Sequence, residues 1–238
     1  MIRALRRRGK ALSKRWWRSP LNPFSTVVSV RTSEPLVALT FDDGPDPVFT
    51  PRLLDILSSH GAKASFFMVG SRARTHPELV ARVAAAGHAV ANHTDSHPSM
   101  PTLSGRSRRR ELRACQAALE PHAIHLFRPP FGHQTLTSRL DAFLTGHDVV
   151  AWGSDVQDWI HQPAETFERR IKETFKPGLI LLLHDSICGG TDPAAADRTS
   201  LLEGLDGALS QSSEFEFVTL PDLFDRGRPH RARWEWTG

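Results

Sequence analysis

Two adjacent aspartates, Asp42 and Asp43, stand in the stretch LTFDDGPDP, between an apolar run and a Gly-Pro pair. Neighbouring carboxylates repel each other and cannot both be buried without partners, so the pair needs a cation or hydrogen-bond donors nearby. Adjacent residues of an extended segment point to opposite sides. One carboxylate can therefore bind a metal ion while the other faces a water molecule on that ion.

A histidine pair supplies further ligands of the kind that a metal ion needs. The stretch HTDSH places His93 and His97 four residues apart, which on a helix brings both imidazoles to one side. Alone, this spacing is a weak signal, because it also arises by chance. A catalytic zinc typically takes three protein ligands of nitrogen and oxygen type and leaves one position open for water. One of the two aspartates would complete such a set.

Short apolar runs alternate with helical patterns along the rest of the chain. Seven strands are expected, at 36–41, 64–69, 88–92, 125–129, 148–152, 179–184 and 215–220. Helices are expected at 50–61, 76–87, 104–120, 134–146, 163–176 and 199–211. This alternation predicts an α/β fold with about seven parallel strands in a closed or nearly closed barrel. An open doubly wound sheet is the alternative.

Polar side chains follow the carboxyl ends of five of these strands. They are Asp42 and Asp43, His93, Arg128, Asp155 and Asp158, and His184. The carboxyl ends of parallel strands lie at one edge of the sheet, where α/β folds carry their catalytic groups. A solvated loop position is the ordinary explanation for any single one of these residues. All of them together predict one cleft.

The composition fits one globular domain with a basic extension. Residues 1–35 are predicted to be a basic N-terminal arm and linker, 36–222 the catalytic domain, and 223–238 a C-terminal tail. The formal net charge of +4 belongs to the arm, because residues 1–18 hold eight basic residues and no acid. The remaining 22 basic and 26 acidic residues give about −4, so the domain itself shows no sign of specific nucleic-acid binding.

The cysteines and the distribution of apolar residues indicate where in the cell the protein is expected. Cys115 and Cys188 are the two cysteines of the chain and form no CxxC pattern, which predicts free thiols. The sequence contains no apolar run of roughly 18 residues, and its basic start is not followed by the apolar stretch of a secretory signal. We therefore expect a cytoplasmic protein, or one peripheral at the inner face of the membrane.

Five motifs in the same order make the chain resemble the polysaccharide deacetylase family, the NodB homology domain of carbohydrate esterase family 4. They are TFDDGP at 40–45, HTDSH at 93–97, RPPFG at 128–132, DVQDW at 155–159 and LLH at 182–184. The resemblance covers roughly residues 36–220, and the segment 75–98 is similar to chitooligosaccharide deacetylases of the family. It implies a distorted (β/α) barrel.

The resemblance also implies roles for the polar residues of the predicted cleft. Asp43, His93 and His97 would bind the metal, usually zinc or another divalent ion such as cobalt, and Asp42 would be the general base. His184 would be the general acid, which a leaving amine requires because it departs only when protonated. A histidine that titrates near neutral pH suits that task.

Five further residues would support this chemistry by resemblance. Asp158 would orient and charge-stabilise the acid, and Arg128 would pair with the base. The backbone N–H of Phe131 would help to hold the oxyanion of the tetrahedral intermediate. Trp159 and Leu182 would line the small apolar pocket for the acetyl methyl group.

The function that these residues predict is metal-dependent N-deacetylation of an oligo- or polysaccharide that contains N-acetylglucosamine, with release of acetate. The expected partner is thus an N-acetylated glycan. An O-acetyl esterase acting on xylan or exopolysaccharide is the alternative enzyme, because the same groups can cleave an ester. A non-catalytic barrel that binds glycan or nucleic acid is the alternative class, and the presence of both Asp42 and His184 argues against it.

The basic arm has the pattern of a membrane-surface segment. Ile2, Leu5, Leu12 and Trp16 fall near one face of a helix drawn through residues 1–20, and Trp17 borders that face. Basic residues occupy much of the remainder, which favours an anionic bilayer surface. A disordered basic tail, or one that binds nucleic acid without specificity, is the alternative.

Vesicle co-sedimentation tests this interpretation of the arm. The full chain should pellet with anionic vesicles but not with neutral ones, and high salt should release part of it, because salt screens the attraction. A truncated chain that starts at Ser19 should stay in the supernatant. Equal behaviour of the two chains would remove the arm from any account of membrane contact.

Overall fold

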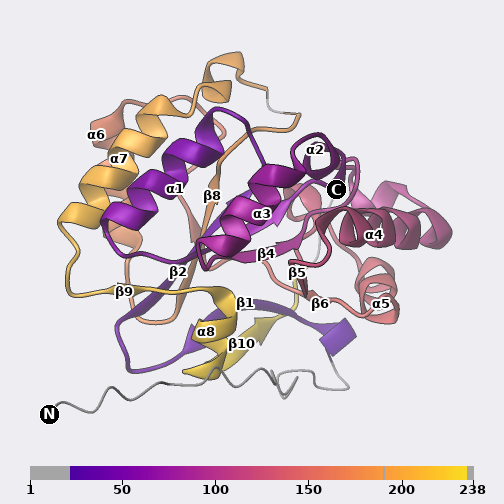
Figure 1. The fold of residues 1–238 in the computed structure, drawn as a ribbon. Helices are drawn as coiled ribbons and strands as arrows, with labels where there is room; N and C mark the ends of the chain where they lie inside the picture. Colours follow the sequence, from indigo (N-terminus) through magenta and orange to yellow (C-terminus); the bar gives the residue numbers. More distant parts are fainter. Residues whose placement is uncertain (1–21, 190, 235–238) are drawn as a thin grey trace, which may run out of the picture.

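The centre of the fold is one sheet with the strand order β10-β1-β8-β2-β3-β4-β5-β6. A computed structural model describes residues 22–189 and 191–234 of the chain (Figure 1). The strands within this part are β1 (Thr26–Arg31), β2 (Leu36–Asp42), β3 (Ala64–Met68), β4 (Ala89–Asn92), β5 (Ala123–Phe127), β6 (Asp148–Val149), β7 (Ser154–Asp155), β8 (Leu179–His184), β9 (Glu216–Phe217) and β10 (Arg228–Ala232). Each of the seven strands predicted from the sequence is present.

The sheet curls into a distorted barrel. The strands from β2 to β6 run parallel to one another, β8 and β9 each run parallel to β2, and β7 runs parallel to β8. The strand β1 is antiparallel to both β8 and β10. An isolated parallel bridge joins Val27 of β1 to Val150 just after β6, so the sheet closes between its last strand, β6, and β1, the neighbour of the edge strand β10. The predicted barrel of about seven parallel strands is therefore confirmed.

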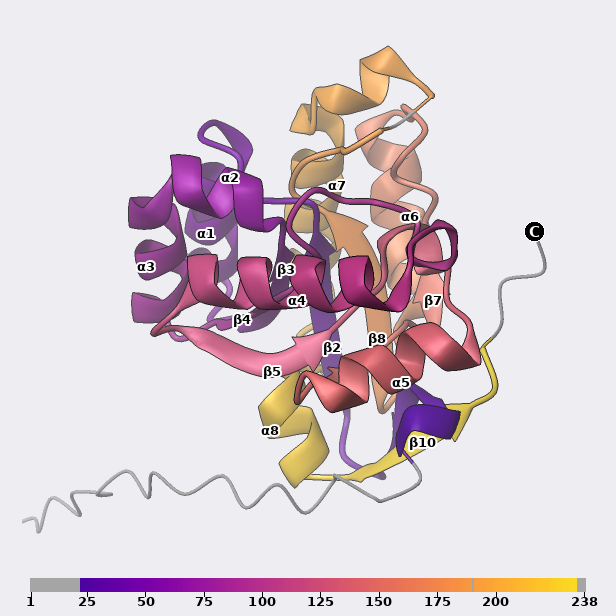
Figure 2. The ribbon, with the colours of Figure 1, turned by 90° about the vertical axis from the view of Figure 1, so that its right-hand side faces the viewer.

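Helices cover the outer side of the barrel, as Figures 1 and 2 show. They are α1 (Phe49–Ser59), α2 (Gly70–Thr75), α3 (Pro77–Ala85), α4 (Gly105–Leu119), α5 (Leu136–Leu144), α6 (Ala164–Thr174), α7 (Thr199–Ser210) and α8 (Leu220–Asp225). Short 3₁₀ turns lie at η1 (Asn22–Phe24), η2 (Met100–Thr102), η3 (Pro130–Gly132) and η4 (Pro193–Ala196). The six predicted helices are all present; α2 and α8 were not predicted.

Alternation along the buried strands decides which side chains reach the inside of the barrel. On β2, Val37, Leu39 and Phe41 pack in the cluster beneath the outer helices. The alternate residues Leu36 and Ala38 belong to a second cluster inside the barrel, which α8 closes at the amino end of β2. By the same period of two, the last residue of β2 faces inward.

The register of β2 and β8 places two predicted catalytic residues side by side. Asp42 is paired with His184, each as the last residue of its strand. The next inward position down the barrel pairs Thr40 with Leu182. The two polar side chains, Asp42 and His184, therefore lie at the mouth of the barrel. The next inward positions are hydrogen-bonded, as at Thr40, or apolar, as at Leu182.

The predicted domain boundaries at 36 and 222 are too narrow. Residues 26–31, interpreted as linker, form β1 in the sheet, and residues 228–232, interpreted as tail, form its edge partner β10. Flanking prolines at 23 and 35 suggested a connector, although the stretch TVVSVR between them has the β-branched alternation of a strand. The polar stretch RPHRA shows no such pattern, as suits an edge strand.

The predicted arm, residues 1–18, lies outside the described residues, so its contact with a membrane stays a prediction. Among residues 22–189 and 191–234, no helix is both long and apolar enough to cross a membrane. Cys115 and Cys188 are free thiols, as predicted, and Cys115 is fully buried.

Candidate active site

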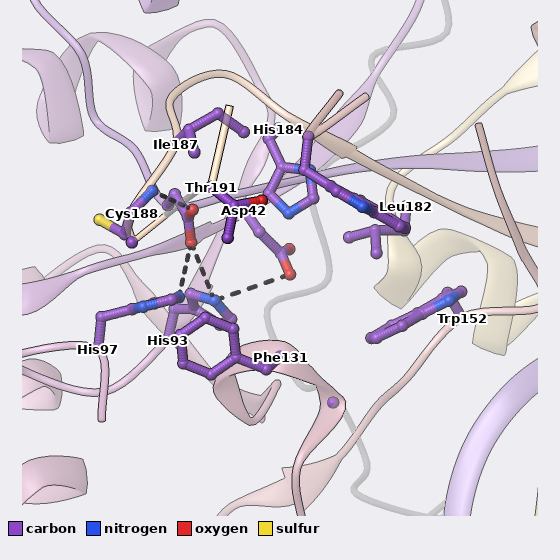
Figure 3. Close-up of a pocket in the computed structure, with 14 residues that line it drawn as sticks. Asp42, His93, His97, Phe131, Trp152, Leu182, His184, Ile187, Cys188 and Thr191 are labelled. Carbon is purple, nitrogen blue, oxygen red and sulfur yellow. Dashed lines mark hydrogen bonds and ion pairs between the residues drawn. The ribbon is translucent and has the colours of Figure 1, made fainter. Parts of the chain in front are cut away.

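Three predicted metal ligands converge at the mouth of the barrel. Asp43, His93 and His97 each offer a ligand atom, and these atoms lie within 4.8 Å of one another. The Oδ1 atom of Asp43 is 3.2 Å from Nε2 of His93 and 3.0 Å from Nε2 of His97, and Figure 3 shows the two imidazoles on one side of the cleft. This buried oxygen makes no well-formed hydrogen bond with a described residue. An orphaned carboxylate oxygen that faces two imidazole nitrogens fits a divalent cation of the zinc type.

Contacts behind the ligands hold them in orientation for a cation. Nδ1 of His93 donates a hydrogen bond of 2.8 Å to the carbonyl of Arg128, which leaves Nε2 unprotonated and turned toward Asp43. The other oxygen of Asp43 accepts the backbone N–H of Cys188 at 2.6 Å. Burial raises the pKa of Asp43, but the close contacts of its carboxylate with the His93 and His97 rings and the nearby charge of His184 outweigh burial and hold this pKa well below its usual value. The carboxylate is therefore ionised, as a metal ligand must be.

The histidine pair comes from a loop and not from a helix, which corrects the helical interpretation of its spacing. Thr94 and His97 both have left-handed backbone conformations, with φ of 67° and 59°. The Glu111 carboxylate on α4 accepts the backbone N–H groups of Asp95 and Ser96 at 3.0 and 2.9 Å. The loop thus brings the two rings to a centroid distance of 5.1 Å without a helical turn.

Left-handed backbone conformations gather around this site. The non-glycine residues with positive φ in the described part of the chain are Asp43, Thr94, His97, Phe131 and Gln157. Each costs roughly 1 kcal/mol or more in a non-glycine residue, and such strain persists where surrounding contacts enforce it. For Asp43, φ of 75° turns the chain directly after β2. This turn, and not the alternation of an extended segment, separates the two aspartates.

Asp42 is held by a buried arginine, as the resemblance implied. Nη1 of Arg128 donates to Oδ1 of Asp42 at 2.7 Å and to the hydroxyl of Thr40 at 2.8 Å. The other oxygen of Asp42 is 3.8 Å from Nε2 of His93 and lines the cleft. Because one oxygen is engaged by the guanidinium, the second is the one that faces the cation site.

His184 forms a buried relay with Asp158 and with an arginine that the sequence analysis missed. Nδ1 of His184 donates to Oδ1 of Asp158 at 2.8 Å, so Nε2 faces the cleft. Arg198 donates to the second oxygen of Asp158 at 2.5 Å and to the carbonyls of Asp158 and His184. Burial lowers the pKa of His184, but the Asp158 carboxylate outweighs it and raises this pKa to about 9. His184 is therefore poised as a proton donor.

Apolar side chains complete the cleft, whose volume is about 300 Å³, at the small end of ligand sites. Phe131, Trp159 and Leu182 line it, as predicted. Phe131 is half exposed at its rim. The last predicted strand-end residue, Asp155, does not line the cleft but accepts the N–H of Gln157 in a turn.

Sequence reasoning missed Trp152 and the segment after β8, with Ile187, Cys188 and Thr191, which also line the cleft. For Arg198 a signal existed. It is the N-cap residue of α7, where the helix dipole disfavours a positive charge. An arginine in that position indicates a partner elsewhere in the fold.

Comparison with known proteins agrees with this geometry. The sequence profile of the family described as polysaccharide deacetylase matches residues 29–150, just over half of the chain. The chain belongs to the polysaccharide deacetylase family. The family is metal-dependent, and this member has an Asp-His-His site that could hold the ion.

Named members of the family match most of the chain. A chitooligosaccharide deacetylase of Sinorhizobium fredii is 36% identical, over 87% of this chain and 94% of the relative. A peptidoglycan-N-acetylglucosamine deacetylase of Bacillus cereus is 34% identical, over 82% of this chain and 70% of the relative. Among solved structures, a peptidoglycan N-acetylglucosamine deacetylase superposes with a TM-score of 0.78 at 31% identity, covering 88% and 97% of the two chains.

The two aspartates should respond differently to substitution. Asp43→Ala should lose both metal and activity, because it removes a ligand. Asp42→Asn should lose activity but keep the metal, because Asp42 does not complete the ligand set. Metal content by atomic spectroscopy, read beside acetate release, checks both. Stoichiometric zinc in Asp43→Ala, or an empty site in Asp42→Asn, would show that the roles are assigned wrongly.

Removing a negative charge beside His184 and removing a positive charge beside it should move the pH profile of kcat in opposite directions. A general acid must be protonated, so kcat falls as pH rises through its pKa. Asp158→Asn removes the anion that raises this pKa, and the alkaline limb should move to lower pH by about 1 to 3 units. Arg198→Met removes a cation beside the same carboxylate and should move the limb to higher pH. If the alkaline limb lay at the same pH in the wild type, Asp158→Asn and Arg198→Met, His184 would be excluded as the acid.

Proposed function

We propose that this protein is a metal-dependent hydrolase that removes N-acetyl groups from oligo- or polysaccharides containing N-acetylglucosamine and releases acetate. One observation carries the proposal. A candidate base and a candidate acid, Asp42 and His184, stand at paired positions of neighbouring strands beside one cation site. Amide hydrolysis needs all three, because water must be deprotonated, the carbonyl polarised and the amine protonated.

We propose zinc as the resident cation, with cobalt as a substitute of the same ligand preference. Asp43, His93 and His97 would hold it, and one carboxylate with two imidazoles is a frequent ligand set of catalytic zinc. When bound, such an ion polarises the acetamide carbonyl and lowers the pKa of a water molecule.

The residues of this chain would then handle the two protons of the reaction. The free oxygen of Asp42 accepts the proton of the attacking water, while Arg128 holds the other oxygen in place. Nε2 of His184 gives a proton to the leaving amine, with Asp158 fixing the ring. Each proton therefore moves to or from one atom, and a neighbouring side chain holds that atom in position.

The remaining cleft residues would hold the acetyl group. The N–H of Phe131 would donate to the developing oxyanion, as a preorganised backbone donor does. Trp159 and Leu182 lie in the same cleft as His184, and the Trp159 ring stands edge-on to the imidazole at a centroid distance of 6.1 Å. They offer an apolar surface to the methyl group and exclude water beside the acid.

Loss of the acid should depend on the leaving group. His184→Ala should lower turnover of an N-acetylated chitooligosaccharide by roughly a hundredfold or more, since a positioned general acid contributes that much. The loss should be smaller for an activated acetate ester, whose leaving group needs no proton. Equal losses on amide and ester, measured as acetate release, would assign His184 a different role.

Acetate release from three substrates tests the substrate class. We expect release from chitooligosaccharides or peptidoglycan, loss of activity with a chelator, and recovery with zinc. The relatives named above act, by their names, on these two kinds of glycan. Release from acetylated xylan alone would overturn N-deacetylation in favour of the O-acetyl esterase.

A further inference from the structure

Trp152 lines the cleft but has no part in the proposed hydrolysis. It lies between β6 and β7, and Figure 3 shows it at the end of the cleft away from His97 and Cys188. The metal ligands, the base, the acid and the methyl pocket are all supplied by other residues. A large aromatic side chain therefore remains partly exposed at the edge of the site without a catalytic task.

The orientation of Trp152 is fixed by a second tryptophan from the far end of the chain. Trp234 packs against it with ring centroids 5.0 Å apart and an interplanar angle of 62°, the edge-to-face geometry that aromatic pairs favour. The indole N–H of Trp234 donates to the carbonyl of Gly132 at 3.1 Å, and Arg139 donates to the carbonyl of Trp234 at 2.6 Å. Trp234 is therefore itself held in place by η3 and α5.

A glycine opposite the ring makes room for this arrangement. Gly132 has φ of +69°, and a Cβ atom there would lie 2.8 Å from Cη2 of Trp152. A side chain at position 132 would push the ring out of its position. Trp152 is thus a preorganised surface, and a ligand that binds to it would not need to order it.

A flat, rigid indole ring at the edge of a cleft suits a ligand with an apolar face and a polar rim. A pyranose ring of a β-linked N-acetylglucosamine unit has this character, because its axial hydrogens form an apolar face and its hydroxyl groups point outward. The cleft of about 300 Å³ has little room beyond one sugar unit, so neighbouring units must bind at its edge.

We propose that Trp152, braced by Trp234, is the stacking platform for a sugar unit next to the one whose acetamide is hydrolysed. The inference rests on the proposed function and adds a subsite to it. It makes Trp152 a residue that sets affinity for longer oligosaccharides and not a catalytic residue.

Titration calorimetry with N-acetylated chitopentaose tests the platform without turnover. The zinc-loaded Asp42→Asn chain is the parent, because it should bind the ligand without consuming it. Adding Trp152→Ala should weaken binding by about tenfold or more, and Trp152→Phe by less, because it keeps a flat ring. The affinity of the Trp234→Ala variant should lie between those of the parent and the Trp152→Ala variant. Phe143→Ala, which removes an exposed ring of α5 that does not line the cleft, is the matched control and should bind like the parent.

The outcomes separate this inference from the proposed function. Equal affinity of the parent and Trp152→Ala would overturn the platform and leave N-deacetylation intact. Binding without acetate release by the wild-type chain would overturn N-deacetylation and leave the platform. The Arg128 guanidinium lies 5.8 Å from the Trp152 ring centroid, so a purely structural role would act through the base. In that case Trp152→Ala, made in the otherwise wild-type chain, would lower kcat with KM unchanged, and the platform would be wrong.

Discussion

One buried guanidinium, that of Arg128, connects the parts of the site. The side chain is fully buried, and its N–H groups bind the Asp42 carboxylate, the Thr40 hydroxyl and the two carbonyls that follow β6. Its own carbonyl sets the tautomer of His93. A buried charge is tolerated only when it is paired and hydrogen-bonded, and removing one partner typically costs about 3 to 5 kcal/mol. The proposed base, a proposed metal ligand and the closure of the barrel are therefore coupled through one residue.

The proposed base and the proposed acid are held in place in the same way. Asp42 and His184 end neighbouring parallel strands, and each is held from behind by a buried arginine, directly by Arg128 in one case and through Asp158 by Arg198 in the other. Strand pairing fixes the separation of the two reactive groups, while the arginines fix their orientation. The spacing of the proposed base and acid is thus set by the sheet, while loops supply His97 and Asp158, the residue that orients His184.

The sequence predicted the parts of the structure that depend on local pattern. The seven parallel strands follow from their apolar runs, and the site residues follow from polar positions at the ends of those strands. Trp234 could not be found in this way, because it acts on a residue that is distant in sequence, with no periodic pattern to reveal it. The N-cap position of Arg198 indicates that it has a partner, but local pattern does not say that this partner is Asp158. The loop of His97 was misinterpreted because a spacing of four residues does not distinguish a helical turn from a left-handed bend.

The loop that carries His97 has a stability of its own. Its left-handed residues are retained by a few hydrogen bonds, chief among them those to Glu111 on α4, so opening it breaks far fewer contacts than unfolding the barrel. Heating would therefore release an ion held by His97 at temperatures at which the sheet is still folded. Thermal inactivation and loss of secondary structure would be separate transitions. Excess metal would raise the temperature of inactivation toward that of the loss of secondary structure.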